Sequence, residues 1–242
     1  MLQRIARKKA EERSINIDTG RKRMKRDIDI KEISDGKLYT ANDMVKTDCH
    51  DCIGCFDCCR GMGSSILLDP MDIWRMTSHL RTDFNSLMDR YVELGMVDGL
   101  ILPNLKLAGD GESCSFLNAE GRCSIHTFRP GICRLFPLGR IYEEDGFKYF
   151  LQVHECPKTD KTKIKVKKWL GITDIKAYEK YIWDWHEFIN QCEEALEELE
   201  EEQRKILTLY ILKTFYQTTY PEADFYVEFY NRLEKAKEMF GF

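Results

Sequence analysis

The sequence predicts a mainly α fold with a small β-hairpin, in which C-terminal helices cover a cysteine-rich domain. Three observations predict it: apolar residues at helical spacing beyond residue 173, one hairpin signal at residues 139–153, and nine of the ten cysteines placed before residue 160. We therefore expect a basic arm at residues 1–48, a cysteine-cluster domain at residues 49–160, and a helical region at residues 161–242 packed on it.

The composition is that of a soluble globular protein. Of the 242 residues, 43% are hydrophobic and 32% are charged, with a net charge of −4 that gives no overall basic field for nucleic acid. No apolar run approaches the roughly 20 residues that span a bilayer, and the N-terminus is charged from Arg4 onward without a signal-peptide core. We expect a cytoplasmic protein without membrane contact, in which clustered cysteines bind metal or react rather than form a disulfide framework.

The first 32 residues hold eleven Lys or Arg against six acidic residues and few large apolar residues. We interpret this segment as a solvated arm. Docking to an acidic partner or nucleic acid is the alternative, although no aromatic side chains interleave with the charges to stack on bases.

Two helices are predicted after the first cysteine run. Asp69 and Pro70 suit the N-cap and first position of one helix, and a second begins at Thr82 or Asp83 and ends at Gly95. Short strands are expected at 66–68, 100–102 and 105–107. The apolar stripes of the two helices indicate core packing rather than a ligand site.

The hairpin at 139–153 has a turn signal in Asp145-Gly146. Beyond it, a long helix is expected after Thr173, an apolar helical stretch at 204–218 that we expect to be buried, and a last helix after Pro221. Cys192 falls on the apolar stripe of the long helix, so we interpret it as a core thiol and exclude it from the site.

Five cysteines lie within Cys49–Arg60, spaced mostly by two residues, which is a rhythm typical of iron–sulfur ligands. A tetrahedral zinc ion needs four ligands, so the nine candidate cysteines are more than one ion can bind. Two metal centres, or one cluster with additional thiols, would account for them. The later cysteines are far apart in the sequence, and we expect them on loops and at the end of the hairpin. The predicted ligands are Cys52, Cys55, Cys58, Cys59, Cys114, Cys123, Cys133 and Cys156.

We predict an iron–sulfur cluster of the 4Fe–4S type, with zinc or mononuclear iron as alternatives. Arginines beside the cysteines are expected to balance thiolate charge and to donate hydrogen bonds to cluster sulfurs: Arg60, Arg122, Arg129, Arg134 and Arg140. His126 and His154 are alternative ligands.

The cysteines and the residues around them resemble the pattern of a known family. The run Cys52-x-x-Cys55-x-x-Cys58-Cys59, followed by Cys114-x-Phe-Leu, Gly121-x-Cys123-x-Ile-His and Arg129-Pro-x-x-Cys133-Arg-x-Phe-Pro, resembles the CxxCxxCC family, described as a zinc- or iron-chelating domain. The resemblance covers about residues 49–157. Asp57 replaces the usual Gly before the double cysteine, and Cys49 lies outside the family pattern. The resemblance implies metal chelation by the shared cysteines.

Three functions remain open at this point. The first is a metalloprotein with a redox or protein-modifying role. The second is a protein lysine N-methyltransferase that uses S-adenosylmethionine, because some relatives are flagellin lysine N-methylases; this chain shows neither a Gly-rich cofactor signature nor the radical-type cysteine spacing. The third is a zinc-stapled interaction module that recruits a protein partner. The sequence leaves open the substrate, the oligomeric state and whether the protein is an enzyme.

Overall fold

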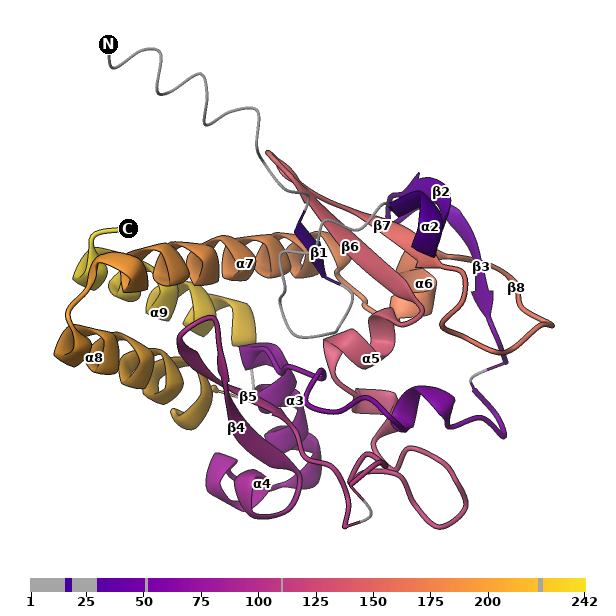
Figure 1. The fold of residues 1–242 in the computed structure, drawn as a ribbon, viewed down its shortest axis with the longest axis horizontal. Helices are drawn as coiled ribbons and strands as arrows, with labels where there is room; N and C mark the ends of the chain where they lie inside the picture. The colour runs from indigo at the N-terminus through magenta and orange to yellow at the C-terminus, as the bar shows by residue number, and fades with distance from the viewer. Residues whose placement is uncertain (1–15, 19–29, 51, 110, 222–223) are drawn as a thin grey trace.

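The computed structural model describes residues 16–18, 30–50, 52–109, 111–221 and 224–242 (Figure 1). Most of the basic arm therefore lies outside the described residues. The strands are β1 (Asn16–Asp18), β2 (Ser34–Tyr39), β3 (Met44–Asp48), β4 (Val92–Val97), β5 (Leu100–Leu105), β6 (Leu138–Glu143), β7 (Gly146–Gln152) and β8 (Thr162–Lys165).

The helices are α2 (Ile30–Ile33), α3 (Pro70–Leu80), α4 (Phe84–Arg90), α5 (Gly131–Leu135), α6 (Val166–Leu170), α7 (Ile175–Glu198), α8 (Glu201–Ile211) and α9 (Phe225–Phe240). Two short 3-10 helices, η1 (Asp57–Cys59) and η2 (His126–Phe128), lie in the cysteine-bearing loops. A π-helical segment, η3 (Leu212–Gln217), continues α8. Among the described residues, no helix combines the length and apolar character that a membrane span requires.

The predicted fold class is wrong. The structure is about 45% helical and 23% strand, with three small sheets instead of one hairpin. The hairpin β6–β7 forms as predicted, but it lies inside a four-stranded antiparallel sheet of order β1-β6-β7-β2. Strands β3 and β8 make a second antiparallel sheet, and β4 and β5 a third.

The hairpin β4–β5 is where the helical interpretation failed. Helix α4 has the predicted N-cap at Asp83, whose side chain accepts a hydrogen bond from the Ser86 N–H, but it ends at Arg90. The chain then turns through Asp98 and Gly99, which have φ angles of 47° and 86°, and Val97 pairs with Leu100. Positive φ at both central residues suits the right-handed twist of a two-residue hairpin.

Contrary to prediction, helices α7, α8 and α9 lie away from the cysteine-bearing loops, whereas α6, also in the predicted C-terminal region, contacts α5. Helix α7 packs along α9, α8 contacts β5, and η3 contacts α3 and α4. Figure 1 shows these helices on one side of the molecule and the cysteine-bearing loops on the other, below α5. Cys192 is fully buried in α7, which agrees with its interpretation as a core thiol.

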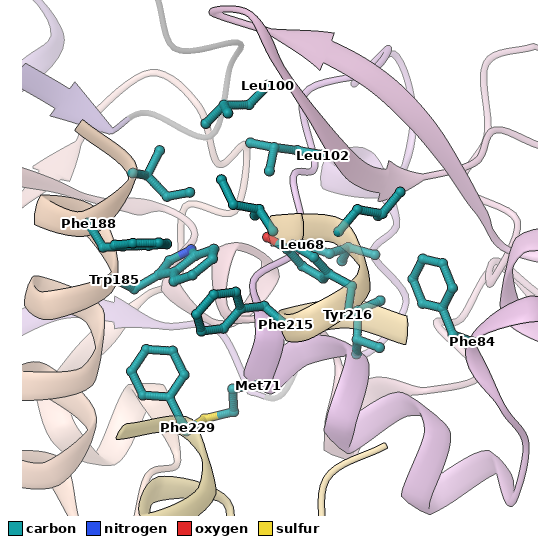
Figure 2. Close-up of a cluster of buried hydrophobic side chains, with 14 of the residues drawn as sticks. Leu68, Met71, Phe84, Leu100, Leu102, Trp185, Phe188, Phe215, Tyr216 and Phe229 are labelled. Atoms are coloured by element: carbon teal, nitrogen blue, oxygen red, sulfur yellow. The ribbon is translucent and has the colours of Figure 1, made fainter. Parts of the chain in front are cut away.

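The main core joins these helices to α3 and the β4–β5 hairpin. Figure 2 shows Trp185 and Phe188 of α7 facing Phe215 and Tyr216 of η3, with Leu100 and Leu102 of β5 above them. Not all of α8 is buried: Ile206 and Leu209 stay exposed, unlike the predicted burial of this stretch.

A second, smaller core lies under the four-stranded sheet. Tyr149 and Leu138 of the β6–β7 hairpin meet Val45 of β3, Val166 of α6 and Leu135 of α5. Ile132 and Ile175 touch both cores. Helix α5 therefore lies where the two cores meet, and this position fixes the segment that carries Cys133.

Candidate metal centre

Seven of the eight predicted ligands line one pocket of the structure. The side chains come from three segments of the chain. Further polar or aromatic residues complete the lining together with apolar residues: Lys106, Arg122, His126, Arg129, Gln152 and Trp169. Of the residues that the structure describes, none after Trp169 lines the pocket. The seven pocket cysteines are Cys52, Cys55, Cys58, Cys59, Cys114, Cys123 and Cys133.

The first segment leaves strand β3 and winds into the short helix η1. Its backbone is hydrogen-bonded directly to the next segment, because the Cys114 N–H donates a hydrogen bond to the Cys59 carbonyl at 2.8 Å. The pairing continues as a bridge between Arg60 and Ser113. Two cysteines 55 positions apart are therefore held together by backbone hydrogen bonds and not by their sulfurs.

The second segment folds back on itself to deliver Cys123. Leu117 pairs with Cys123, and the Ser124 N–H donates to the Phe116 carbonyl at 2.8 Å. Gly121 has a φ of 70°, and a Cβ built there would lie 2.9 Å from the Phe56 ring. A side chain at this position would both strain the backbone and strike Phe56, so glycine lets the loop close on the first cysteine run.

Cys133 is carried by α5 and held by two arginines that bond to backbone. Arg129 Nε donates to the Cys133 carbonyl at 3.2 Å, and Arg129 Nη1 lies 2.9 Å from His126 Nδ1. Buried Arg134 donates to three carbonyls, those of Arg129, Thr127 and Leu170, at 2.9, 2.9 and 3.3 Å. These guanidinium groups fix the loop that shapes the pocket.

The expected arginine cluster is thus divided. Arg122 and Arg129 line the pocket. Arg60 lies 4.6 Å over the Phe56 ring, and Arg140 donates to the Tyr178 hydroxyl at 3.1 Å. Only two of the five predicted arginines are lining residues that can face a bound group.

Cys156 is not among the pocket-lining residues. Its carbonyl accepts a hydrogen bond from Lys161 Nζ, and the neighbouring Lys158 donates to the Ile53 carbonyl at 3.3 Å. The loop of Cys156 therefore runs beside the Cys52–Cys55 turn. His154 also lies outside the lining residues, whereas His126 is among them.

Four of the pocket thiols act on one another electrostatically. Burial raises the pKa of Cys114, Cys123 and Cys133, and the negative charge of Cys58 raises all three further. Cys123 acts on Cys114, and both act on Cys133. Every pair within this quartet of Cys58, Cys114, Cys123 and Cys133 is therefore close enough to interact.

Cys58 differs from the other three. A hydrogen bond from Cys59 is the main cause that lowers the pKa of Cys58 to about 7, and the charge of Arg129 lowers it further. The same bond raises the pKa of Cys59. Cys58 is thus the pocket thiol with the strongest tendency to be a thiolate, the form that binds metal.

The sequence did not reveal every residue that builds this pocket. Trp169 lies before the predicted long helix, in a stretch without any ligand signal, yet it lines the pocket. Asp72 accepts a hydrogen bond from the Gly131 N–H at the start of α5. The Asp69-x-x-Asp72 pattern marks a helix start, but no local signal connects it to a glycine 59 residues later.

Residues 51–167 match the model of the CxxCxxCC family, described as "Putative zinc- or iron-chelating domain". The chain carries a CxxCxxCC domain. The predicted resemblance is confirmed, and so is its coarse implication, a cysteine-rich domain that chelates zinc or iron. The CxxCxxCC domain includes the seven pocket cysteines and Cys156, whereas Cys49 and Cys192 lie outside it. No curated protein and no solved structure matches the chain.

Proposed function

We propose that the CxxCxxCC domain binds an iron–sulfur centre and that the protein is a redox metalloprotein of a reducing compartment such as the cytoplasm. The observation that carries the proposal is the quartet Cys58, Cys114, Cys123 and Cys133, four mutually interacting thiols in a pocket lined by seven. Such a centre needs reduced thiols, and a reducing compartment such as the cytoplasm keeps cysteines in that form.

The spacing of the thiols supports a group larger than one ion. Thiolates bound at about 2.3 Å to one tetrahedral zinc lie roughly 3.8 Å from each other. Among the described residues, no three Cys, His, Asp or Glu side chains converge closely enough to hold a single ion. Thiolates that bind separate iron atoms of one cluster lie farther apart, and four of them suffice for a 4Fe–4S cluster.

The surroundings of the quartet fit this group. Ile66, Leu105 and Phe116 are buried and line the pocket, so they keep water from one side of it. The charge of Arg129 acts on Cys58 and Cys123 and offsets the charge of their thiolates. When bound, an iron–sulfur centre accepts and donates single electrons at a potential set by such charges and by solvent access.

The test is purification without oxygen, followed by iron, sulfide and zinc analysis and visible absorption. We expect iron and acid-labile sulfide in equal amounts and a brown protein. Cys133→Ser is expected to lose the absorption, whereas Cys55→Ser, outside the quartet, is expected to retain it. A colourless protein that contains zinc and no sulfide would show that the pocket is a zinc site.

A further inference from the structure

Cys49 is a buried thiol that the proposed centre does not use. It lies outside the pocket and the matched domain, and its side chain is 5% exposed. Its sulfur is nevertheless 3.5 Å from the sulfur of Cys52, a pocket residue. The two cysteines form a Cys-x-x-Cys pair that reaches from the core to the pocket edge.

The fold holds this pair in place from both sides. Cys49 directly follows strand β3, where Asp48 pairs with Thr162 of β8 and accepts a hydrogen bond from its hydroxyl. After Cys49 the chain turns sharply: His50 and Cys52 both have a φ of 56°. Left-handed conformations are unfavourable for residues with a Cβ, so this turn is maintained by the structure around it.

We propose that Cys49 and Cys52 form a thiol–disulfide site that reacts with small anionic disulfides such as glutathione disulfide, and that its oxidation withdraws Cys52 from the metal pocket. The first half of this inference stands on the contact between the two sulfurs alone. The second half rests on the proposed function of the pocket.

The chemistry balances in two exchange steps. The more exposed Cys52 attacks the small disulfide, forming a mixed disulfide and releasing one small thiol. Cys49 then attacks the Cys52 sulfur, which forms the Cys49–Cys52 disulfide and releases the second small thiol. Two protein thiols are oxidised, one small disulfide is reduced to two thiols, and their protons pass from the cysteines to the released sulfurs.

The short distance between the two sulfurs favours this reaction. A disulfide bond of about 2.05 Å requires them to approach by only about 1.5 Å from their present contact. Burial, the contact with Cys49 and the charge of Cys58 raise the pKa of Cys52, and the charge of Arg129 acts in the opposite direction. Lys158 donates to the carbonyl of Ile53, so a second cation, an ammonium group, lies beside the Cys52 turn. Both cations attract an anionic disulfide.

The consequence for the pocket follows from the position of Cys52. Its sulfur lies close enough to Cys58 for their charges to interact. Once bonded to Cys49, the Cys52 sulfur is no longer a thiolate, and its side chain is drawn toward the buried residue. Oxidation therefore removes one thiol from the pocket and takes it away from Cys58, a member of the quartet, so we expect the pocket to bind metal less tightly.

The test uses the reduced, metal-free full chain and one molar equivalent of glutathione disulfide. Free thiols are then alkylated, and cleavage before aspartate separates the peptides 48–50 and 51–56. We expect these two peptides to be joined by a disulfide. Because 51–56 also contains Cys55, the variant Cys55→Ser assigns the bond, and it is expected to retain the joined peptides. Their absence from that variant would overturn the inference.

The second measurement is zinc affinity by competition with a chelator, before and after the same oxidation. We expect at least a tenfold loss on oxidation in the unmodified chain and in Cys192→Ser, a control for another buried thiol. Cys49→Ser is expected to bind zinc normally and to show no such loss. If Cys49→Ser itself bound zinc tenfold less tightly, Cys49 would be a ligand and the inference would be wrong.

The two proposals fail in different ways. An untreated chain that binds neither zinc nor iron would refute the proposed function, whereas the joined peptides would still decide the thiol–disulfide site. Metal binding with joined peptides but unchanged zinc affinity would refute the coupling between the site and the pocket.

Discussion

The carboxylate of Asp72 accepts a hydrogen bond of 2.7 Å from the backbone N–H of Gly131, in the buried interior. Asp72 also accepts from the Asp69 N–H, while Asp69 accepts from the Asp72 N–H, so both carboxylates belong to the capping box of α3. Helix α5 has five residues, too few for stability on its own. The first turn of α3 therefore fixes the helix that carries Cys133.

Replacing Asp72 is expected to affect both stability and metal binding. In Asp72→Ala the buried Gly131 N–H loses its acceptor, so we expect the free energy of unfolding to fall by about 1–3 kcal/mol. Because Cys133 loses its support, zinc affinity is expected to fall about 10-fold or more, as for other residues that orient ligands. Chemical denaturation and chelator competition measure the two effects.

The matched control is Asp83→Ala, which removes the N-cap of α4. Its side chain accepts from the Ser86 N–H but has no contact with the pocket. We expect lower stability with unchanged zinc affinity. If Asp72→Ala behaved in the same way, the positioning role of Asp72 would be refuted.

Much of the candidate site could be predicted because the residue type alone identifies cysteine as a metal ligand. Eight cysteines were proposed as ligands, and seven line one pocket. The sequence could not reveal that Cys156 lies outside the pocket lining, because the path of its loop depends on the pairing of β8 with β3, more than 100 residues earlier. The role of Arg134 could not be predicted either, since it donates to backbone carbonyls that only the folded loop brings together.

The helices were predictable where local signals agreed. Asp69 with Pro70 and the long stripe of α7 gave α3 and α7 nearly as observed. Between them, apolar residues at helical spacing predicted one helix that ended at Gly95: Phe84, Leu87, Tyr91 and Leu94. Leu94 lies in strand β4 instead, so its match to the helical spacing is a coincidence. The Asp98-Gly99 turn was the competing signal, and pairing with β5 decided the outcome. Short strands that pair far along the chain, such as β2 and β3, leave little local trace.

Gly139 is expected to be a sensitive position of the four-stranded sheet. It pairs with Phe150 across β6 and β7, and a Cβ at Gly139 would clash with ring atoms of Phe150. Gly139→Ala should therefore lower the free energy of unfolding by about 1–3 kcal/mol through overpacking. The double variant Gly139→Ala with Phe150→Leu is expected to recover part of the loss in chemical denaturation.

Gly109→Ala is the control for Gly139, because a Cβ there meets no atom within 4 Å and its φ is not positive. We expect its midpoint of denaturation to stay close to that of the unmodified chain. Equal losses in the two variants would show that the contact with Phe150 does not set the requirement for glycine at position 139.

Metal binding and stability are expected to depend on pH in opposite senses. Burial and the neighbouring thiolates raise the pKa of Cys114, Cys123 and Cys133, so these thiols are protonated at neutral pH, whereas Cys58, with a pKa of about 7, is largely ionised near pH 8. Binding of a metal centre to all four thiols should release about three protons at pH 8 and strengthen as pH rises. Calorimetry in buffers of different ionisation enthalpy measures the proton release.

The metal-free chain should lose stability at alkaline pH. The folded state keeps protons on Cys114, Cys123 and Cys133 above their ordinary pKa of 9.0, where the unfolded chain has released them. Since the folded state then binds more protons, the free energy of unfolding falls as pH rises beyond about 9. Bound metal removes these protons, so the loaded protein should show a smaller decline. Parallel declines in both forms would argue against these thiols as ligands.

Arg134 is expected to tolerate no replacement by lysine. Its guanidinium donates hydrogen bonds to three carbonyls, those of Thr127, Arg129 and Leu170. A lysine ammonium cannot reproduce this planar arrangement of donors. Burial and the nearby charge of Arg75 lower the pKa of Arg134 to about 10, so the site is already costly for a cation. Arg134→Lys should lower the free energy of unfolding by about 1.5–3 kcal/mol and weaken zinc binding through the Arg129–Cys133 loop.

Arg60→Lys serves as its counterpart, because Arg60 is exposed and interacts with the face of the Phe56 ring, which a lysine can also approach. We expect a small change in stability and unchanged zinc affinity, measured by denaturation and chelator competition. Arg134→Lys with full stability but weaker zinc binding would instead indicate that Arg134 acts through its charge on the pocket and not through its three hydrogen bonds.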